Sequence, residues 1–121
     1  MKRIVVTRKK KLASAMMPYW IIAGPSKASF KEAHGFQSDL CEMAESGFAV
    51  SRISVEELDS IGTRIGNGQT IELEVPDDVS TLFVSTMDGC LSNEAAVDGR
   101  EIIVSTAGGF RKLPCPVIEV K

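Results

Sequence analysis

Turn-forming residues recur about every ten residues in the second half of this 121-residue chain, and this spacing limits the folds it can adopt. Strands separated by Gly, Asp and Pro at such short intervals are typical of a β-sandwich or barrel. The turn signals are Gly66–Gly68, Pro76–Asp78, Asp88–Gly89, Asp98–Gly99 and Gly108–Gly109.

The segments between these turns have the pattern of strands. Residues 70–75 alternate Thr or Glu with Ile71, Leu73 and Val75, which predicts a strand with one buried face. Other β-branched or alternating runs lie at 4–7, 18–23, 48–53, 82–84, 101–105 and 116–120. We therefore predict a mainly β fold, an antiparallel β-sandwich of about seven strands, in a single domain over residues 1–121.

The region from about 26 to 61 differs from this pattern and predicts a helical insertion with one or two short helices. Ser38 or Asp39 can cap the first helix, which carries apolar residues at i, i+3 and i+4 spacing and ends before Gly47. The second helix begins with Ser54-Val55-Glu56-Glu57, a capping-box pattern, and ends at Gly62. Helices this short need a sheet to pack against.

Charge is unevenly distributed along the chain, although its net value is only −2. Residues 1–31 hold eight Lys or Arg and no acid, whereas residues 32–101 hold fifteen acids against three Arg, a net charge of −12. The acidic isoelectric point of about 5.4 argues against a nucleic-acid binder, so we expect the basic end to face acidic strands of the same domain.

Cysteine usage and hydropathy point to a cytoplasmic protein. Cys41, Cys90 and Cys115 are an odd number at wide spacing, which is typical of reduced thiols rather than of a disulfide framework. An apolar stretch over 12–24 is interrupted by Pro18 and its aromatic neighbours and has no cleavage signal after it. No run reaches the ~18 apolar residues of a membrane span, so we expect no membrane partner.

The candidate binding surface combines basic and aromatic residues near the N-terminus. Adjacent residues in a strand point to opposite faces, so we expect one of Tyr19 and Trp20 in the core and the other more exposed. An exposed aromatic side chain can stack on a sugar or insert into a partner protein. The proposed surface consists of Arg8, Lys9, Lys10, Lys11, Tyr19 and Trp20.

Catalytic and metal-binding patterns are almost absent from the sequence. His34 is the single histidine, so a Cys–His pair must use it, and Cys41 lies seven residues away at the predicted start of a helix. No C-x-x-C or H-x-x-x-H pair predicts zinc, and no Asp-rich loop predicts calcium. No glycine-rich phosphate loop is present either. We expect no metal and no cofactor.

Two parts of the chain together resemble a small bacterial β-sandwich module that occurs in many proteins without an assigned activity. In that module a basic strand leads to a strand that ends in glycine, and a turn of the N-G-x type precedes an alternating strand closed by proline. The corresponding residues are Lys9–Lys11, Tyr19–Ile22 and Gly66–Pro76. The resemblance implies a sandwich frame and supplies no catalytic residue. Residues 26–61 depart from the module and have the character of an insertion.

Three hypotheses for function follow from the sequence. The first is a non-catalytic binding or protein-interaction module, which either associates with itself through a sheet edge or binds another cytoplasmic protein. The second is a small enzyme that uses His34 and Cys41. The third is a carbohydrate-binding domain centred on Trp20. The sequence favours the first of these, because it offers no complete catalytic constellation.

Overall fold

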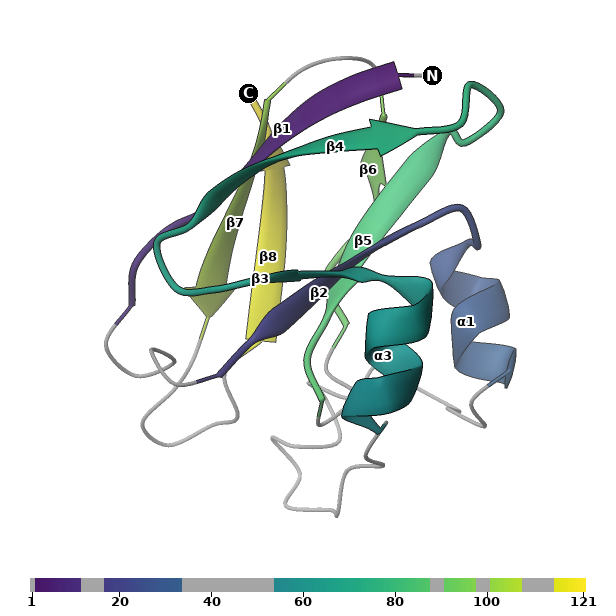
Figure 1. Ribbon diagram of the computed structural model, residues 1–121, viewed down its shortest axis with the longest axis horizontal. Helices are drawn as coiled ribbons and strands as arrows, with labels where there is room; N and C mark the ends of the chain where they lie inside the picture. The colour runs from purple at the N-terminus through teal and green to yellow at the C-terminus, as the bar shows by residue number, and fades with distance from the viewer. Residues whose placement is uncertain (1, 12–16, 34–53, 88–90, 98–100, 108–114) are drawn as a thin grey trace.

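The computed structural model describes residues 2–11, 17–33, 54–87, 91–97, 101–107 and 115–121 as a mainly β fold with two short helices (Figure 1). The helices are α1 (Lys27–Ala33) and α3 (Val55–Ile61). The described strands are β1 (Lys2–Arg8), β2 (Tyr19–Ala23), β3 (Thr63–Ile65), β4 (Thr70–Val75), β5 (Thr81–Ser85), β6 (Ala95–Ala96), β7 (Ile102–Ala107) and β8 (Cys115–Val120).

The strands form two four-stranded sheets. Sheet A has the order β4-β1-β7-β8, and sheet B has the order β3-β2-β5-β6. Every pairing within sheet B is antiparallel, but β1 and β7 run parallel in sheet A. The predicted antiparallel character is therefore wrong for sheet A, which is mixed. Alternation within a segment predicts a strand and its buried face, but it contains no information on the direction of a partner about a hundred residues away.

One hydrophobic core joins the inner faces of both sheets. The alternate residues Ile4 and Val6 of β1 face it from sheet A, and Tyr19 and Ile21 of β2 face it from sheet B. On β4, Val75 is buried and its neighbours Ile71 and Leu73 pack partly against the core; this is the alternation that the sequence predicted. The two sheets are thus held together mainly by burial of aliphatic side chains.

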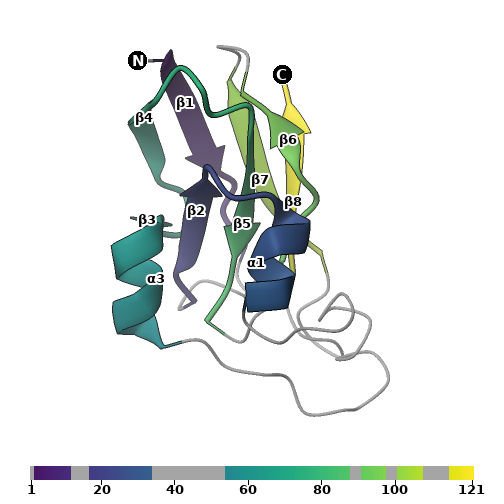
Figure 2. The ribbon, with the colours of Figure 1, turned by 90° about the vertical axis from the view of Figure 1, so that its right-hand side faces the viewer.

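Sheet B is also covered on its second face by both helices. In Figure 1 the helices stand on the opposite side of β2 and β5 from β7 and β8, and in Figure 2 α1 lies in front of β5. Phe30 of α1 packs edge-on against Phe83 of β5, with ring centroids 5.2 Å apart. Leu58 of α3 is fully buried. The residues that point away from the core between the two sheets are therefore buried too, which gives β2 four consecutive buried residues.

The predicted start of α3 is confirmed. Ser54 has an extended backbone, and its hydroxyl accepts a hydrogen bond from the backbone N–H of Glu57 at 3.2 Å. Gly62 follows the helix and donates its N–H to the carbonyl of Leu58. The sequence did not predict α1, while the helix expected after Ser38 and the strand expected at 48–53 lie outside the described residues.

The turn after β3 determines how the two sheets are connected. Gly68 adopts a positive φ of 76°, and the Gln69 N–H donates to the carbonyl of Gly66. This is the tight turn that the Gly66–Gly68 signal predicts. The strands on either side of it do not pair with each other, because β3 pairs with β2 and β4 pairs with β1. The chain thus passes from sheet B to sheet A within a few residues.

The β8 edge of sheet A is closed by a side chain. The amide of Asn93 donates to the carbonyl of Ile118 at 3.0 Å and accepts from the Ile118 N–H at 2.9 Å. These two bonds replace those that a neighbouring strand would make. Pro116, earlier on β8, has no N–H to offer. Side chains that occupy an edge in this way reduce pairing with other chains.

We expect Asn93→Ala to weaken the fold and open the β8 edge. Loss of two hydrogen bonds at a partly exposed site should lower the free energy of unfolding by about 1–2 kcal/mol. Urea denaturation gives this value, and amide exchange at Ile118 should become faster. Glu94→Ala, at the neighbouring exposed residue, is the control and should change neither quantity. Unchanged exchange at Ile118 in Asn93→Ala would show that the amide does not protect this edge.

Candidate functional site

The basic tract Arg8–Lys11 belongs mainly to the folded framework and is only in part a free surface. Arg8 is fully buried, and its guanidinium carbon lies 3.7 Å from the centre of the Tyr19 ring. Its Nη1 donates to the carbonyl of Ile65 at 3.1 Å. Burial lowers the pKa of Arg8 from its usual value, and the electrostatic attraction of Tyr19 opposes this shift. A guanidinium keeps its charge nevertheless. The prediction that Arg8 belongs to an exposed binding surface is therefore wrong.

The lysines that follow Arg8 differ in their environments. Lys11 is half-buried: its backbone N–H donates to Asn67 Oδ1, and its Nζ donates to the carbonyl of Thr106 at 2.8 Å. Lys9 and Lys10 have exposed side chains. Of the predicted surface, therefore, only these two lysines offer freely accessible charge.

Tyr19 and Trp20 are both buried, with no exposed surface on either side chain. The expectation that one of them is exposed is wrong, because sheet B is covered on both faces. Tyr19 points into the core, where its hydroxyl forms a 2.7 Å hydrogen bond with Thr106 Oγ1. Trp20 points toward the helices. Stacking on a sugar requires a free indole face, and the buried indole of Trp20 offers none.

Trp20 belongs to a polar cluster that fastens α3 to sheet B. Its indole N–H donates to Asp59 Oδ1 at 2.8 Å, and Arg64 Nη2 donates to Asp59 Oδ2 at 2.7 Å. The Arg64 guanidinium also lies 5.3 Å from the centre of the Trp20 ring. The hydrogen bond from Trp20, assisted by those from Arg64 and by its charge, lowers the pKa of Asp59 against a smaller opposing effect of desolvation. This cluster is well satisfied, which fits a structural role.

The two residues of the predicted catalytic pair, His34 and Cys41, lie outside the described residues. Within the part of the chain that is described, no three His, Cys, Asp or Glu side chains gather closely enough to hold a metal ion. Neither described helix has the length and apolarity that crossing a membrane requires.

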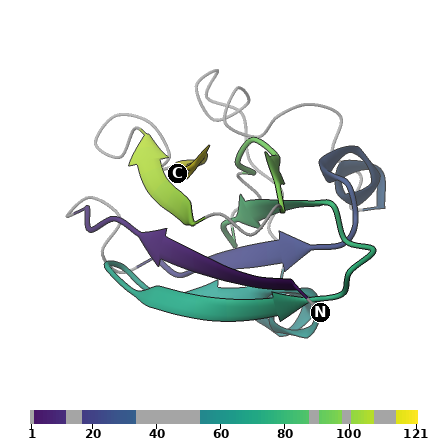
Figure 3. The ribbon, with the colours of Figure 1, turned by 90° about the horizontal axis from the view of Figure 1, so that it is seen from above.

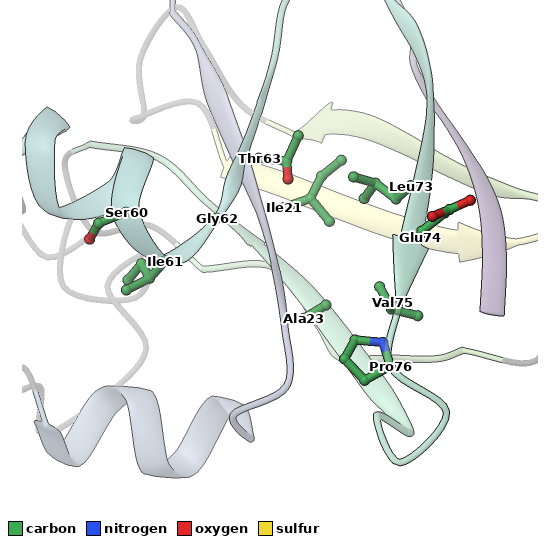
Figure 4. A pocket seen from close by; sticks show the side chains of 10 residues that line it. All are labelled: Ile21, Ala23, Ser60, Ile61, Gly62, Thr63, Leu73, Glu74, Val75 and Pro76. Carbon is green, nitrogen blue, oxygen red and sulfur yellow. The ribbon is translucent and has the colours of Figure 1, made fainter. Parts of the chain in front are cut away.

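A pocket of about 270 Å³ opens where the two sheets part at β3 and β4. Figure 4 shows Ile21 of β2 and Leu73 of β4 approaching each other across it, while the carboxylate of Glu74 points away. Ile61, the last residue of α3, is 40% exposed at its rim. Polar and apolar groups share the lining, which consists of Ile21, Ala23, Ser60, Ile61, Gly62, Thr63, Leu73, Glu74, Val75 and Pro76.

The strand beside this pocket has an open edge. Figure 3 shows β4 as the outermost strand beside β1. The Arg8 N–H donates to the carbonyl of Gln69, and hydrogen-bonded pairs alternate along an antiparallel ladder. In the observed register Leu73 therefore directs its backbone groups toward β1, whereas Glu72 and Glu74 direct theirs outward. Among the described residues, no backbone group pairs with these outward N–H and C=O groups.

Sequence reasoning identified β4 correctly but did not identify its edge as a site. The alternation over 70–75 indicates which side chains are buried, not which strands flank the segment. One available signal was the pair Glu72 and Glu74, because charged residues on a strand are common at sheet edges. The pocket depends on contacts between segments far apart in sequence, such as Ile21 and Leu73.

No protein-family model, curated protein or solved structure matches this chain. The resemblance to small bacterial β-sandwich modules therefore stays a prediction. The geometry of the described residues is the basis for the function proposed below.

Asp59→Asn should lower stability in a pH-dependent manner. The pKa of Asp59 in the fold lies below its unfolded value of about 3.9, so the carboxylate stabilises the fold fully above that value. This contribution is lost as the pH falls through the folded pKa. Asparagine retains an acceptor for the Trp20 N–H but loses the charge that faces Arg64. We expect the variant to be less stable at pH 7, with a difference from wild type that shrinks toward pH 2.

The measurement is urea denaturation followed by fluorescence of Trp20, the single tryptophan of the chain. Asp78→Asn, in the exposed turn after β4, is the control and should match wild type. A difference between Asp59→Asn and wild type that stays constant from pH 7 to pH 2 would contradict the assigned role of the carboxylate.

Proposed function

We propose that this chain is a non-catalytic protein-interaction module that binds an extended segment of a partner along the outer edge of β4. The observation that supports it most is the outward N–H and C=O groups of Glu72 and Glu74 beside a pocket whose lining includes the aliphatic side chains of Ile21 and Leu73. An extended peptide can complete such a sheet edge with main-chain hydrogen bonds, and pockets beside the edge then select its side chains.

The pocket is placed where an added strand would need it. A strand beside β4 extends sheet A over the space between β4 and β3. Its inward side chains would point in the same direction as Leu73, toward Ile21 and the exposed Ile61. Burying one aliphatic side chain there contributes roughly 1.5–3 kcal/mol, which adds to the hydrogen bonds along the edge.

The chemistry of the pocket favours binding over catalysis. Its polar side chains are the hydroxyls of Ser60 and Thr63 and the carboxylate of Glu74, which points away. None of these groups forms a nucleophile–base pair among the described residues. Widely spaced cysteines support a reducing compartment, and we place the module in the cytoplasm for that reason.

Glu72→Pro tests the proposed edge directly. Because the Glu72 N–H points outward, proline there removes a donor from the free edge and leaves the β1–β4 ladder intact. We expect the variant to keep the wild-type Trp20 emission. Peptides selected against wild type from a displayed random library should bind it at least about tenfold more weakly. Glu72→Ala is the matched control and should retain most of the binding. Leu73→Pro should instead destabilise the fold, since that N–H faces β1.

Amide exchange locates the bound peptide. Peptides selected against wild type should protect the amides of Glu72 and Glu74. Selected peptides that leave these amides unprotected, or that bind Glu72→Pro as well as wild type, would contradict the proposal. Binding that is lost on Lys9→Glu and Lys10→Glu alone would favour the surface expected from the sequence.

A further inference from the structure

The outer edge of β4 carries a regular chemical pattern that restricts its partner. Ile71, Leu73 and Val75 point toward the core, and Glu72 and Glu74 point to the outer face with exposed side chains. The backbone groups directed to the free edge belong to these two glutamates and, at the start of the strand, to Thr70. A residue placed directly opposite Glu72 or Glu74 therefore has its own side chain on the outer face, beside a carboxylate.

Little within the described structure neutralises this pair. Arg3 Nη2 lies 3.5 Å from Glu74 Oε1, and both side chains are mostly exposed. A surface pair of this geometry contributes little and is easily rearranged. Glu72 lies directly opposite Val5 in the ladder, so its direct partner on β1 carries no charge. The turn that follows β4 adds Asp77 and Asp78, which makes this end of the edge more acidic.

A second copy of the chain is a poor occupant of this edge. Two β4 strands paired antiparallel around a two-fold axis, in the registers that overlap most of the strand, place Glu72 opposite Glu72 or opposite Glu74. Like charges directly opposite each other destabilise a strand pair. The β8 edge is not a suitable partner either, because the Asn93 amide already occupies the backbone groups of Ile118.

We propose that the β4 edge selects an extended segment of another protein in which lysine or arginine alternates with aliphatic residues. This inference rests on the proposed strand addition and specifies its partner. The basic side chains lie on the outer face opposite Glu72 and Glu74. The aliphatic side chains lie on the inner face beside Leu73, and one of them enters the pocket between Ile21 and Ile61. The same glutamates that attract this segment prevent pairing of β4 with itself.

The test uses three segments of six residues, the length of β4, each fused through a flexible linker to a soluble carrier. Valine alternates with lysine in the first, with serine in the second and with glutamate in the third. We expect affinity to decrease in that order, with at least about a tenfold difference in Kd between the lysine and glutamate segments at low salt. The difference should shrink as salt screens the exposed charges.

Charge reversal supplies the complementary measurement. Glu72→Lys/Glu74→Lys should invert the order of the lysine and glutamate segments. The matched control is Glu94→Lys/Glu119→Lys, which makes the same change in net charge at exposed residues near the opposite edge. This control should keep the wild-type order. An order that inverts equally in both variants would show that net charge, and not the β4 edge, selects the segment.

The outcomes separate this inference from the proposed function. If all three segments protect the Glu72 and Glu74 amides with equal affinity, charge selection is wrong while strand addition stands. If no segment protects these amides but random peptides do, charge selection is again wrong. If neither segments nor random peptides protect them, the proposed function is wrong. A wild-type dimer in which these amides are protected would contradict the exclusion of self-pairing.

Discussion

The burial of β2 on both faces is the constraint on which the rest of the structure depends. Tyr19 and Ile21 enter the core between the sheets, and Trp20 and Ile22 lie beneath the helices. A strand with two buried faces needs a layer on each side, so the helices are as necessary to sheet B as sheet A is. The hydrogen bonds of Asp59 to Trp20 and Arg64 fix α3 in that layer.

A second constraint comes from the short turn at Gly66–Gln69, which sends consecutive strands to different sheets. Strands joined by so tight a turn usually pair with each other as a hairpin. Here β3 and β4 pair with β2 and β1 instead, and the space between them is filled only partly by Leu73 and its neighbours. The pocket and the open edge are therefore two results of one connection.

Local patterns in the sequence predicted much of this fold. Alternation over 70–75 predicted both β4 and its buried face, and the capping box at Ser54 predicted the start of α3. The sequence did not predict the parallel pairing of β1 with β7 or the burial of Arg8, because both depend on segments far away along the chain. A charged residue next to three lysines suggests a solvated surface, and only the tertiary fold places its guanidinium against Tyr19.

The two edge strands of sheet A, β8 and β4, limit pairing with other strands in different ways. At β8 the Asn93 side chain makes the bonds of a missing neighbour, so that edge cannot accept one without losing them. At β4 no described residue pairs with the outward backbone groups, and the nearest barrier to non-specific pairing is the charge of Glu72 and Glu74. Charge is a selective barrier: it opposes acidic and identical strands but favours basic ones. An edge that is protected by charge is therefore better suited to recognition than an edge whose backbone groups are already bonded.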